Sequence, residues 1–169
     1  MSETPAMKQP DPCAMVIFGA GGDLTKRLLI PALYNLAKTG LIPDNFLIIG
    51  ADIADRQSAE WASSLHAALA EFAGNASAED QIRGVDPAVW AKLAGQMHYL
   101  QGDFTKDEFY HTLADKLGAL EQDHGTVGNR LFYLAVADRF FGPIVTHLGA
   151  AKLTAHGGEQ FFTECMLFT

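Results

Sequence analysis

Residues 13–36 read CAMVIFGAGGDLTKRLLIPALYNL, and this stretch decides the fold. Five apolar residues, 14–18, lead into the glycine-rich turn GAGGD at residues 19–23, and apolar residues at helical spacing follow. Glycines let the backbone turn tightly and approach a ligand without a Cβ in the way. Free N–H groups at the start of the next helix favour a phosphate. The order strand, glycine turn, helix therefore favours nucleotide binding, and the glycines taken alone fit a plain structural turn equally well.

Length and composition indicate one globular domain. The chain has 169 residues, of which 49% are hydrophobic and 19% charged. A net charge of −8 argues against a nucleic-acid partner, which would need a basic face. Two cysteines cannot form a disulfide framework, so we expect a reducing, cytoplasmic compartment. We find no metal-ligand spacing, no secretory signal and no apolar run near the roughly 20 residues of a membrane span, and we expect no metal and no membrane partner.

Apolar patterning along the rest of the chain predicts alternating strands and helices. Short, nearly all-apolar runs predict strands at residues 14–18, 46–50, 97–101 and 129–136. Helical spacing predicts helices at residues 24–38, 54–72, 87–93, 106–120 and 140–148. Buried strands separated by helices are typical of an α/β fold with a doubly wound, mostly parallel sheet.

Single residues predict where the helices begin and break. Asp23 and Thr105 are good N-cap types for the helices that follow them. Pro31 removes a backbone hydrogen bond, at about 3 kcal/mol in a regular helix interior, so we expect a helix over residues 24–29, a kink and a second piece. Gly40 is expected to end that second piece as a C-cap glycine.

Polar and small residues follow each predicted strand. These segments are residues 19–23, 50–52, 102–104 and 135–138. Because ligands of parallel sheets bind beyond the carboxyl ends of the strands, all four segments converge on one candidate site. The convergence favours a nucleotide site more strongly than the first turn does alone.

The first turn resembles the nucleotide loop of glucose-6-phosphate dehydrogenases, which reads G-A-S-G-D-L-[AT]-K-[RK]. Residues 19–27 match this pattern except at Gly21, where the family has serine or threonine. Two more stretches resemble the family, GDFTKDEFY at residues 102–110 and NRLFYLAVADRFFGPIVTHL at residues 129–148. The resemblance covers residues 14–153.

This resemblance implies a Rossmann-type domain that binds NADP, with NAD as the alternative. It places Asp103 and Phe104 beside the adenosine. The alternative for Lys26 and Arg27 is a solvated pair in the first helical turn, and capping is the expected role of the Asp23 side chain. The predicted cofactor-binding residues are Gly19, Ala20, Gly21, Gly22, Asp23, Leu24, Thr25, Lys26, Asp52, Arg56, Asp103, Phe104 and Ala137.

Several positions depart from the family pattern. Asp138 stands where the family has proline, and Leu28 where many members have lysine or arginine near the nicotinamide and substrate. Many members also carry an arginine for the 2′-phosphate of NADP where this chain has Asp52 and Ile53, with Arg56 next along. A carboxylate there accepts hydrogen bonds from a ribose and repels a 2′-phosphate. The residues favour NAD, whereas family habit favours NADP.

The resemblance implies the activity of an NADP-dependent dehydrogenase in the pentose phosphate pathway, oxidising glucose 6-phosphate to its lactone. In the family the catalytic histidine lies in a second, sugar-phosphate domain, in an Asp-His-Tyr-x-[GA]-Lys motif. We therefore expect no catalytic residue, no homo-oligomer interface and no turnover in this chain. Residues 1–12 are expected to be a disordered lead-in, residues 13–153 the NAD(P)-binding domain, and residues 154–169 an anomalous tail from truncation or a shifted frame.

Two other functional classes compete with this interpretation. One is a stand-alone NAD(P)-binding module, or pseudoenzyme, without turnover. The other is an epimerase-like short-chain enzyme, and it is disfavoured because no Tyr-x-x-x-Lys follows the fourth predicted strand.

Overall fold

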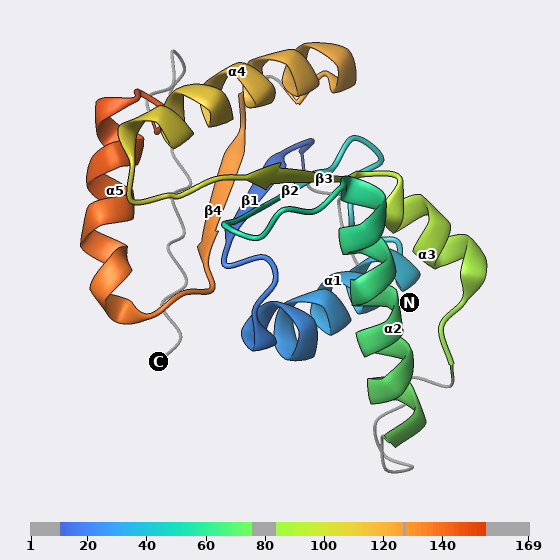
Figure 1. Cartoon of the computed structure of the whole chain (residues 1–169). Helices are drawn as coiled ribbons and strands as arrows, with labels where there is room; N and C mark the ends of the chain where they lie inside the picture. The colour runs from blue at the N-terminus through green and yellow to red at the C-terminus, as the bar shows by residue number, and fades with distance from the viewer. Residues whose placement is uncertain (1–10, 76–83, 127, 155–169) are drawn as a thin grey trace, which may run out of the picture.

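The computed structural model describes residues 11–75, 84–126 and 128–154, and a parallel sheet lies at its centre (Figure 1). Within the described residues the sheet has four strands in the order β3-β2-β1-β4. The strands are β1 (Ala14–Phe18), β2 (Leu47–Asp52), β3 (Met97–Gln101) and β4 (Arg130–Leu134). In the register of the sheet, Ile17 of β1 lies between Gly50 of β2 and Tyr133 of β4. A first strand flanked by the second and fourth is the arrangement of a doubly wound fold, so the predicted fold class is confirmed.

Helices cover both faces of this sheet (Figure 1). One face packs against η1 (Thr25–Leu29), α1 (Ile30–Lys38), α2 (Ser58–Asn75) and α3 (Pro87–Ala94). The other face packs against α4 (Asp107–His124) and α5 (Phe141–Ala150), which follows the short turn η2 (Asp138–Phe140). Alternate residues of β1 serve the two faces: Ile17 belongs to the first core cluster and Val16 to the second.

The expected kink at Pro31 takes the form of a π-helical turn. The Ile30 N–H donates to the Thr25 carbonyl, five residues back, and the helix continues through Pro31 to Lys38. A proline lacks the N–H of a regular helix, and its ring clashes with the carbonyl four residues back. A wider turn directly before the proline accommodates both features.

The end of α1 agrees with the prediction for Gly40. Gly40 has φ +72°, and its N–H donates to the Ala37 carbonyl at 3.1 Å. The Leu41 N–H donates to the Leu36 carbonyl at 2.9 Å. These two bonds form the Schellman arrangement that a C-cap glycine permits, so this prediction is confirmed.

The N-cap predicted at Asp23 is wrong. Asp23 already lies within the first helical turn, which opens with a bond from the Lys26 N–H to the Gly22 carbonyl at 3.2 Å. The Asp23 carboxylate instead lies 3.1 Å from Arg27 Nε, in an ion pair whose two side chains are both more than 70% exposed. The chain enters the helix one residue earlier than the capping pattern implied, because the glycine turn leads directly into it.

The N-cap predicted at Thr105 is also wrong. The Thr105 hydroxyl donates to Asp103 Oδ1 at 2.6 Å, and α4 begins after Lys106 with no side-chain cap. Thr105 instead takes part in a local turn, in which both its hydroxyl and its N–H donate to the carboxylate at the exit of β3.

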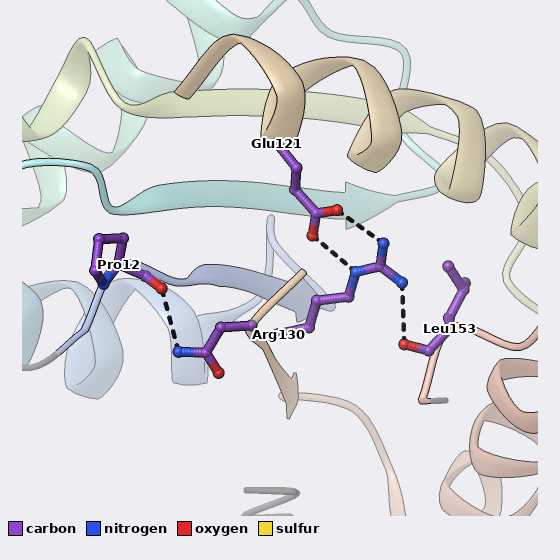
Figure 2. A network of polar contacts seen from close by, with 5 residues as sticks. Pro12, Glu121, Arg130 and Leu153 are labelled. Atoms are coloured by element: carbon purple, nitrogen blue, oxygen red, sulfur yellow. Dashed lines mark hydrogen bonds and ion pairs between the residues drawn. The ribbon is translucent and has the colours of Figure 1, made fainter. Parts of the chain in front are cut away.

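A partly buried ion pair joins three elements at the amino end of β4 (Figure 2). Arg130 Nε and its second terminal nitrogen donate to the two Glu121 oxygens at 2.7 and 2.8 Å. The other terminal nitrogen donates to the Leu153 carbonyl at 3.2 Å. Arg130 therefore ties the last turns of α4 and the segment after α5 to the sheet, at the end opposite the predicted site.

Candidate functional site

The glycine turn after β1 is held between two neighbouring segments. Gly19 has φ +84°, and a Cβ on it would lie 2.3 Å from the Ala135 carbonyl oxygen, so no other residue fits there. The N–H groups of Gly19 and Ala20 both donate to the Ala51 carbonyl, at 3.0 and 3.2 Å. The turn therefore lies at the carboxyl edge of the sheet, fastened to the end of β2 and in contact with the exit of β4.

Two buried side chains donate hydrogen bonds to carbonyl groups of this turn. Thr25 is fully buried, and its hydroxyl donates to the Gly19 carbonyl at 3.0 Å. The Trp61 indole, from α2, donates to the Ala20 carbonyl at 2.9 Å. A Cβ on Gly50 would lie 2.5 Å from the Trp61 ring, so glycine in β2 is what lets the indole reach the turn.

Burial limits what two members of the predicted set can do. Ala20 and Thr25 have no exposed surface, so neither side chain can reach a ligand from its present position. Their contribution to binding would be the shape of the loop. Trp61 belongs to the first core cluster, and the sequence did not predict its part in holding the loop. The glycine inside the second apolar run was the available signal.

Asp52 is the side chain that the structure brings closest to the loop. The Gly21 N–H donates to Asp52 Oδ2 at 2.7 Å, and the Ile53 N–H donates to Oδ1 at 2.8 Å. A Cβ on Gly21 would lie 3.0 Å from the same Oδ2, so glycine there permits the close approach. The prediction placed this carboxylate toward a ribose, and the bonds that the structure shows for it are those to the Gly21 and Ile53 N–H groups.

Tyr99 of β3 positions the connection between β2 and α2. Its hydroxyl donates to the Ala54 carbonyl at 2.8 Å, and its N–H donates to the Ser58 hydroxyl at 2.9 Å. These bonds hold residues 54–57 outside the helix. The helix predicted from residue 54 therefore begins at Ser58.

The charges beside this connection are mostly negative. Burial raises the pKa of Tyr99; the carboxylates of Asp52 and Asp55 raise it further, and the Arg56 guanidinium lowers it. Within the described residues Arg56 has no ion-pair partner. Two carboxylates and one guanidinium therefore surround the exit of β2.

The predicted residues that follow β3 and β4 take a less direct part in the candidate site than those of the glycine turn and β2. Asp103 accepts from the hydroxyl and N–H of Thr105, and these bonds lower its carboxyl pKa. The Phe104 ring packs edge-on against Phe18, with centroids 5.9 Å apart, as part of the second core cluster. Ala137 is exposed and precedes η2 as its N-cap.

Lys26 lies to one side of the sheet edge. It is half-buried and, together with Arg27 and Glu71, lines a groove of about 560 Å³ between the first helical turns and α2. The exposed ion pair of Arg27 with Asp23 agrees with the solvated alternative for that residue. The remaining predicted residues at positions 19–24, 52 and 56 lie in or beside the loop and the β2 exit.

The described part of the chain lacks two further features. It holds no group of three or more His, Cys, Asp or Glu side chains that could bind a metal ion. None of the helices in these ranges has the length and apolarity that crossing a membrane requires.

The fold and loop together define a dinucleotide-binding α/β domain of Rossmann type. The family described as glucose-6-phosphate dehydrogenase, NAD binding domain, matches residues 16–163, and the chain belongs to this family. The glucose-6-phosphate 1-dehydrogenase of Chlamydia muridarum is 36% identical over 165 residues, which cover 96% of this chain and 31% of that protein.

Solved structures agree with this assignment. A crystal structure of glucose-6-phosphate 1-dehydrogenase from Mycobacterium avium matches with a TM-score of 0.68 and 30% identity, over 86% of this chain and 28% of that one. A glucose-6-phosphate dehydrogenase in complex with its substrate glucose-6-phosphate shares the fold, with a TM-score of 0.71 and 24% identity. The chain spans less than a third of the length of these relatives.

Proposed function

We propose that this chain is the coenzyme-binding domain of a glucose-6-phosphate dehydrogenase, and that its glycine turn holds the diphosphate of NADP or NAD. The observation that carries the proposal is the Gly19–Gly22 turn at the carboxyl edge of a parallel sheet. Two elements brace it, β2 through Ala51 and Asp52 and α2 through Trp61, and it opens directly into a helix. A glycine turn with a helix start behind it suits an anionic diphosphate.

The residues present fit a dinucleotide at this edge. Side chains are absent at Gly21 and Gly22, and a Cβ at either position would meet Asp52 Oδ2 or the Gly19 carbonyl within 3.2 Å. The N–H groups of residues 19–22 are bonded within the protein, so a phosphate would meet the turn at the helix start that follows it. When bound, the nicotinamide group supplies the hydride acceptor, and this domain supplies binding and orientation.

For the whole protein we propose the oxidation of glucose 6-phosphate at C1 to the corresponding lactone. The names of the relatives support this reaction, and the family resemblance assigns the base to a histidine in a second domain. We also propose a cytoplasmic setting, with neither nucleic acid nor membrane as partner. The net charge of −8 disfavours nucleic acid, and Cys13, a free thiol whose burial raises its pKa to about 11, is compatible with a reducing compartment.

Calorimetric titration with NADP and NAD tests the binding proposal. Gly22→Val should weaken both affinities at least about tenfold, because its Cβ would lie 3.2 Å from the Gly19 carbonyl oxygen and would force the turn that holds the diphosphate to shift. Gly118→Val is the matched control, since Gly118 lies on α4 with no atom within 4 Å of its would-be Cβ. Circular dichroism of each variant checks that the sheet stays folded.

The outcomes separate binding from structure. A wild-type chain that binds neither dinucleotide would contradict the proposal. Equal affinities in Gly22→Val and wild type would mean that the glycine turn has a structural role only. A loss in Gly118→Val as large as in Gly22→Val would show that the titration reports general damage.

A further inference from the structure

The Asp52 carboxylate has both occupied and free acceptor positions. An ionised carboxylate offers about four lone-pair positions. One on Oδ2 takes the Gly21 N–H and one on Oδ1 takes the Ile53 N–H. Because Asp52 is half-buried and not enclosed, the remaining positions can accept from a ligand at the end of β2. A pair of ribose hydroxyls is the donor set that suits them.

The side chains around this carboxylate do not provide a phosphate site. Ile53, which stands where the family resemblance places an arginine, is apolar and 66% exposed. Three charged groups act on the Tyr99 hydroxyl: the carboxylates of Asp52 and Asp55, and the guanidinium of Arg56 as the single cation. A 2′-phosphate would add further negative charge to a position where carboxylates already outnumber cations.

We propose that Asp52 makes this domain select NAD over NADP. It accepts hydrogen bonds from the adenosine ribose hydroxyls and repels the 2′-phosphate. Its bond to the Gly21 N–H also sets the position of the loop, so one side chain couples cofactor choice to loop shape. The inference rests on the proposed dinucleotide binding and departs from the NADP use of the family.

The size of the effect follows from the charges. Two unit charges about 4 Å apart change an affinity by roughly fivefold in water and by several hundredfold near a protein surface. Asp52 is half-buried, so the effect should lie between these limits and should weaken as salt rises.

The test is calorimetric titration of the full chain with NAD and with NADP, at low and at moderate salt. Asp52→Asn removes the charge and keeps an oxygen that can accept the Gly21 N–H, so it should raise the NADP-to-NAD affinity ratio at least about fivefold. Asp55→Asn is the matched control, because it removes a neighbouring carboxylate that has no bond to the loop, and its ratio should change less. Asp52→Glu keeps the charge on a longer side chain and should keep the preference for NAD.

Three results decide between the proposals. If the wild-type chain binds neither cofactor, the proposed function itself fails. If it binds both but prefers NADP, or if Asp52→Asn leaves the ratio unchanged at both salts, the inference about Asp52 is overturned while dinucleotide binding stands. If Asp52→Asn does not fold, Asp52→Glu provides the test instead. If the wild-type chain prefers NAD and Asp52→Glu, which keeps the charge, loses that preference, the charge argument is overturned.

Discussion

At the scale of single residues, glycines decide where side chains from distant segments can meet. Gly50 admits the Trp61 ring to the underside of the loop, and Gly21 admits the Asp52 carboxylate to its edge. Gly19 turns the chain with a positive φ against the Ala135 carbonyl. At each of these three positions a close neighbour excludes a side chain. The neighbour differs from one position to the next, so a substitution at each would disturb a different contact.

The Glu121–Arg130 pair is the strongest residue-scale test of stability (Figure 2). The Arg130 side chain is 16% exposed and that of Glu121 9%. Arg130→Met leaves the carboxylate buried without its partner, so the free energy of unfolding should fall by about 3 kcal/mol in urea denaturation.

An exposed ion pair provides the control for this measurement. Lys92 lies 2.6 Å from Asp44, with both side chains more than 60% exposed. Lys92→Met should leave the unfolding midpoint nearly unchanged, because exposed pairs contribute little. A loss of stability in Lys92→Met equal to that in Arg130→Met would mean that burial of the Arg130 pair is not what matters.

At the scale of elements, the contact between β3 and α4 contains a histidine that is poorly suited to carry charge. His98 Nε2 is buried and, within the described residues, has no hydrogen-bond partner. Burial lowers the pKa of His98 below its ordinary value, and the neighbouring Lys116 and His124 lower it further. The folded chain therefore binds fewer protons at this site than the unfolded chain does.

This difference predicts a loss of stability in acid. The contribution of His98 is fully present above its ordinary pKa of about 6.5 and declines as pH falls below that value. Urea midpoints measured between pH 7.5 and 5 should fall, and His98→Phe should make the fall shallower. His111→Asn changes an exposed histidine on α4 and should keep the wild-type slope. An identical pH dependence in His98→Phe would contradict the assignment.

At the scale of the whole molecule, one side of the domain remains apolar and open. Leu28, which is 61% exposed, and Leu36 line a groove of about 470 Å³ between α1 and the sheet, together with Tyr133 of β4. The walls of this groove are almost entirely apolar.

The whole-molecule prediction concerns turnover. The chain as given should bind a dinucleotide and should not oxidise glucose 6-phosphate, because a general base must lie within hydrogen-bond reach of the proton it takes. No Asp-His-Tyr-x-[GA]-Lys motif occurs among the 169 residues. The measurement is NADPH or NADH formation by protein free of host dehydrogenase, against a no-enzyme blank. Steady formation above that blank would refute the prediction.

The order of strands and helices, the parallel sheet and the position of the glycine turn could all be predicted from the sequence. These follow from local patterns: apolar runs of strand length, helical spacing and glycine at Gly19 and Gly40. The form of the kink at Pro31 did not follow, because α and π turns before a proline differ only in which carbonyl accepts the Ile30 N–H.

Which side chains meet at the site depends on how the strands and helices pack. Gly21 and Asp52 are 31 positions apart, and their bond exists because β1 and β2 pair in parallel and in one register. The same holds for Trp61, which reaches the loop across Gly50 from a helix on one face of the sheet. Such contacts depend on how whole elements pack. The local spacing of apolar residues does not indicate which residues of distant elements will meet.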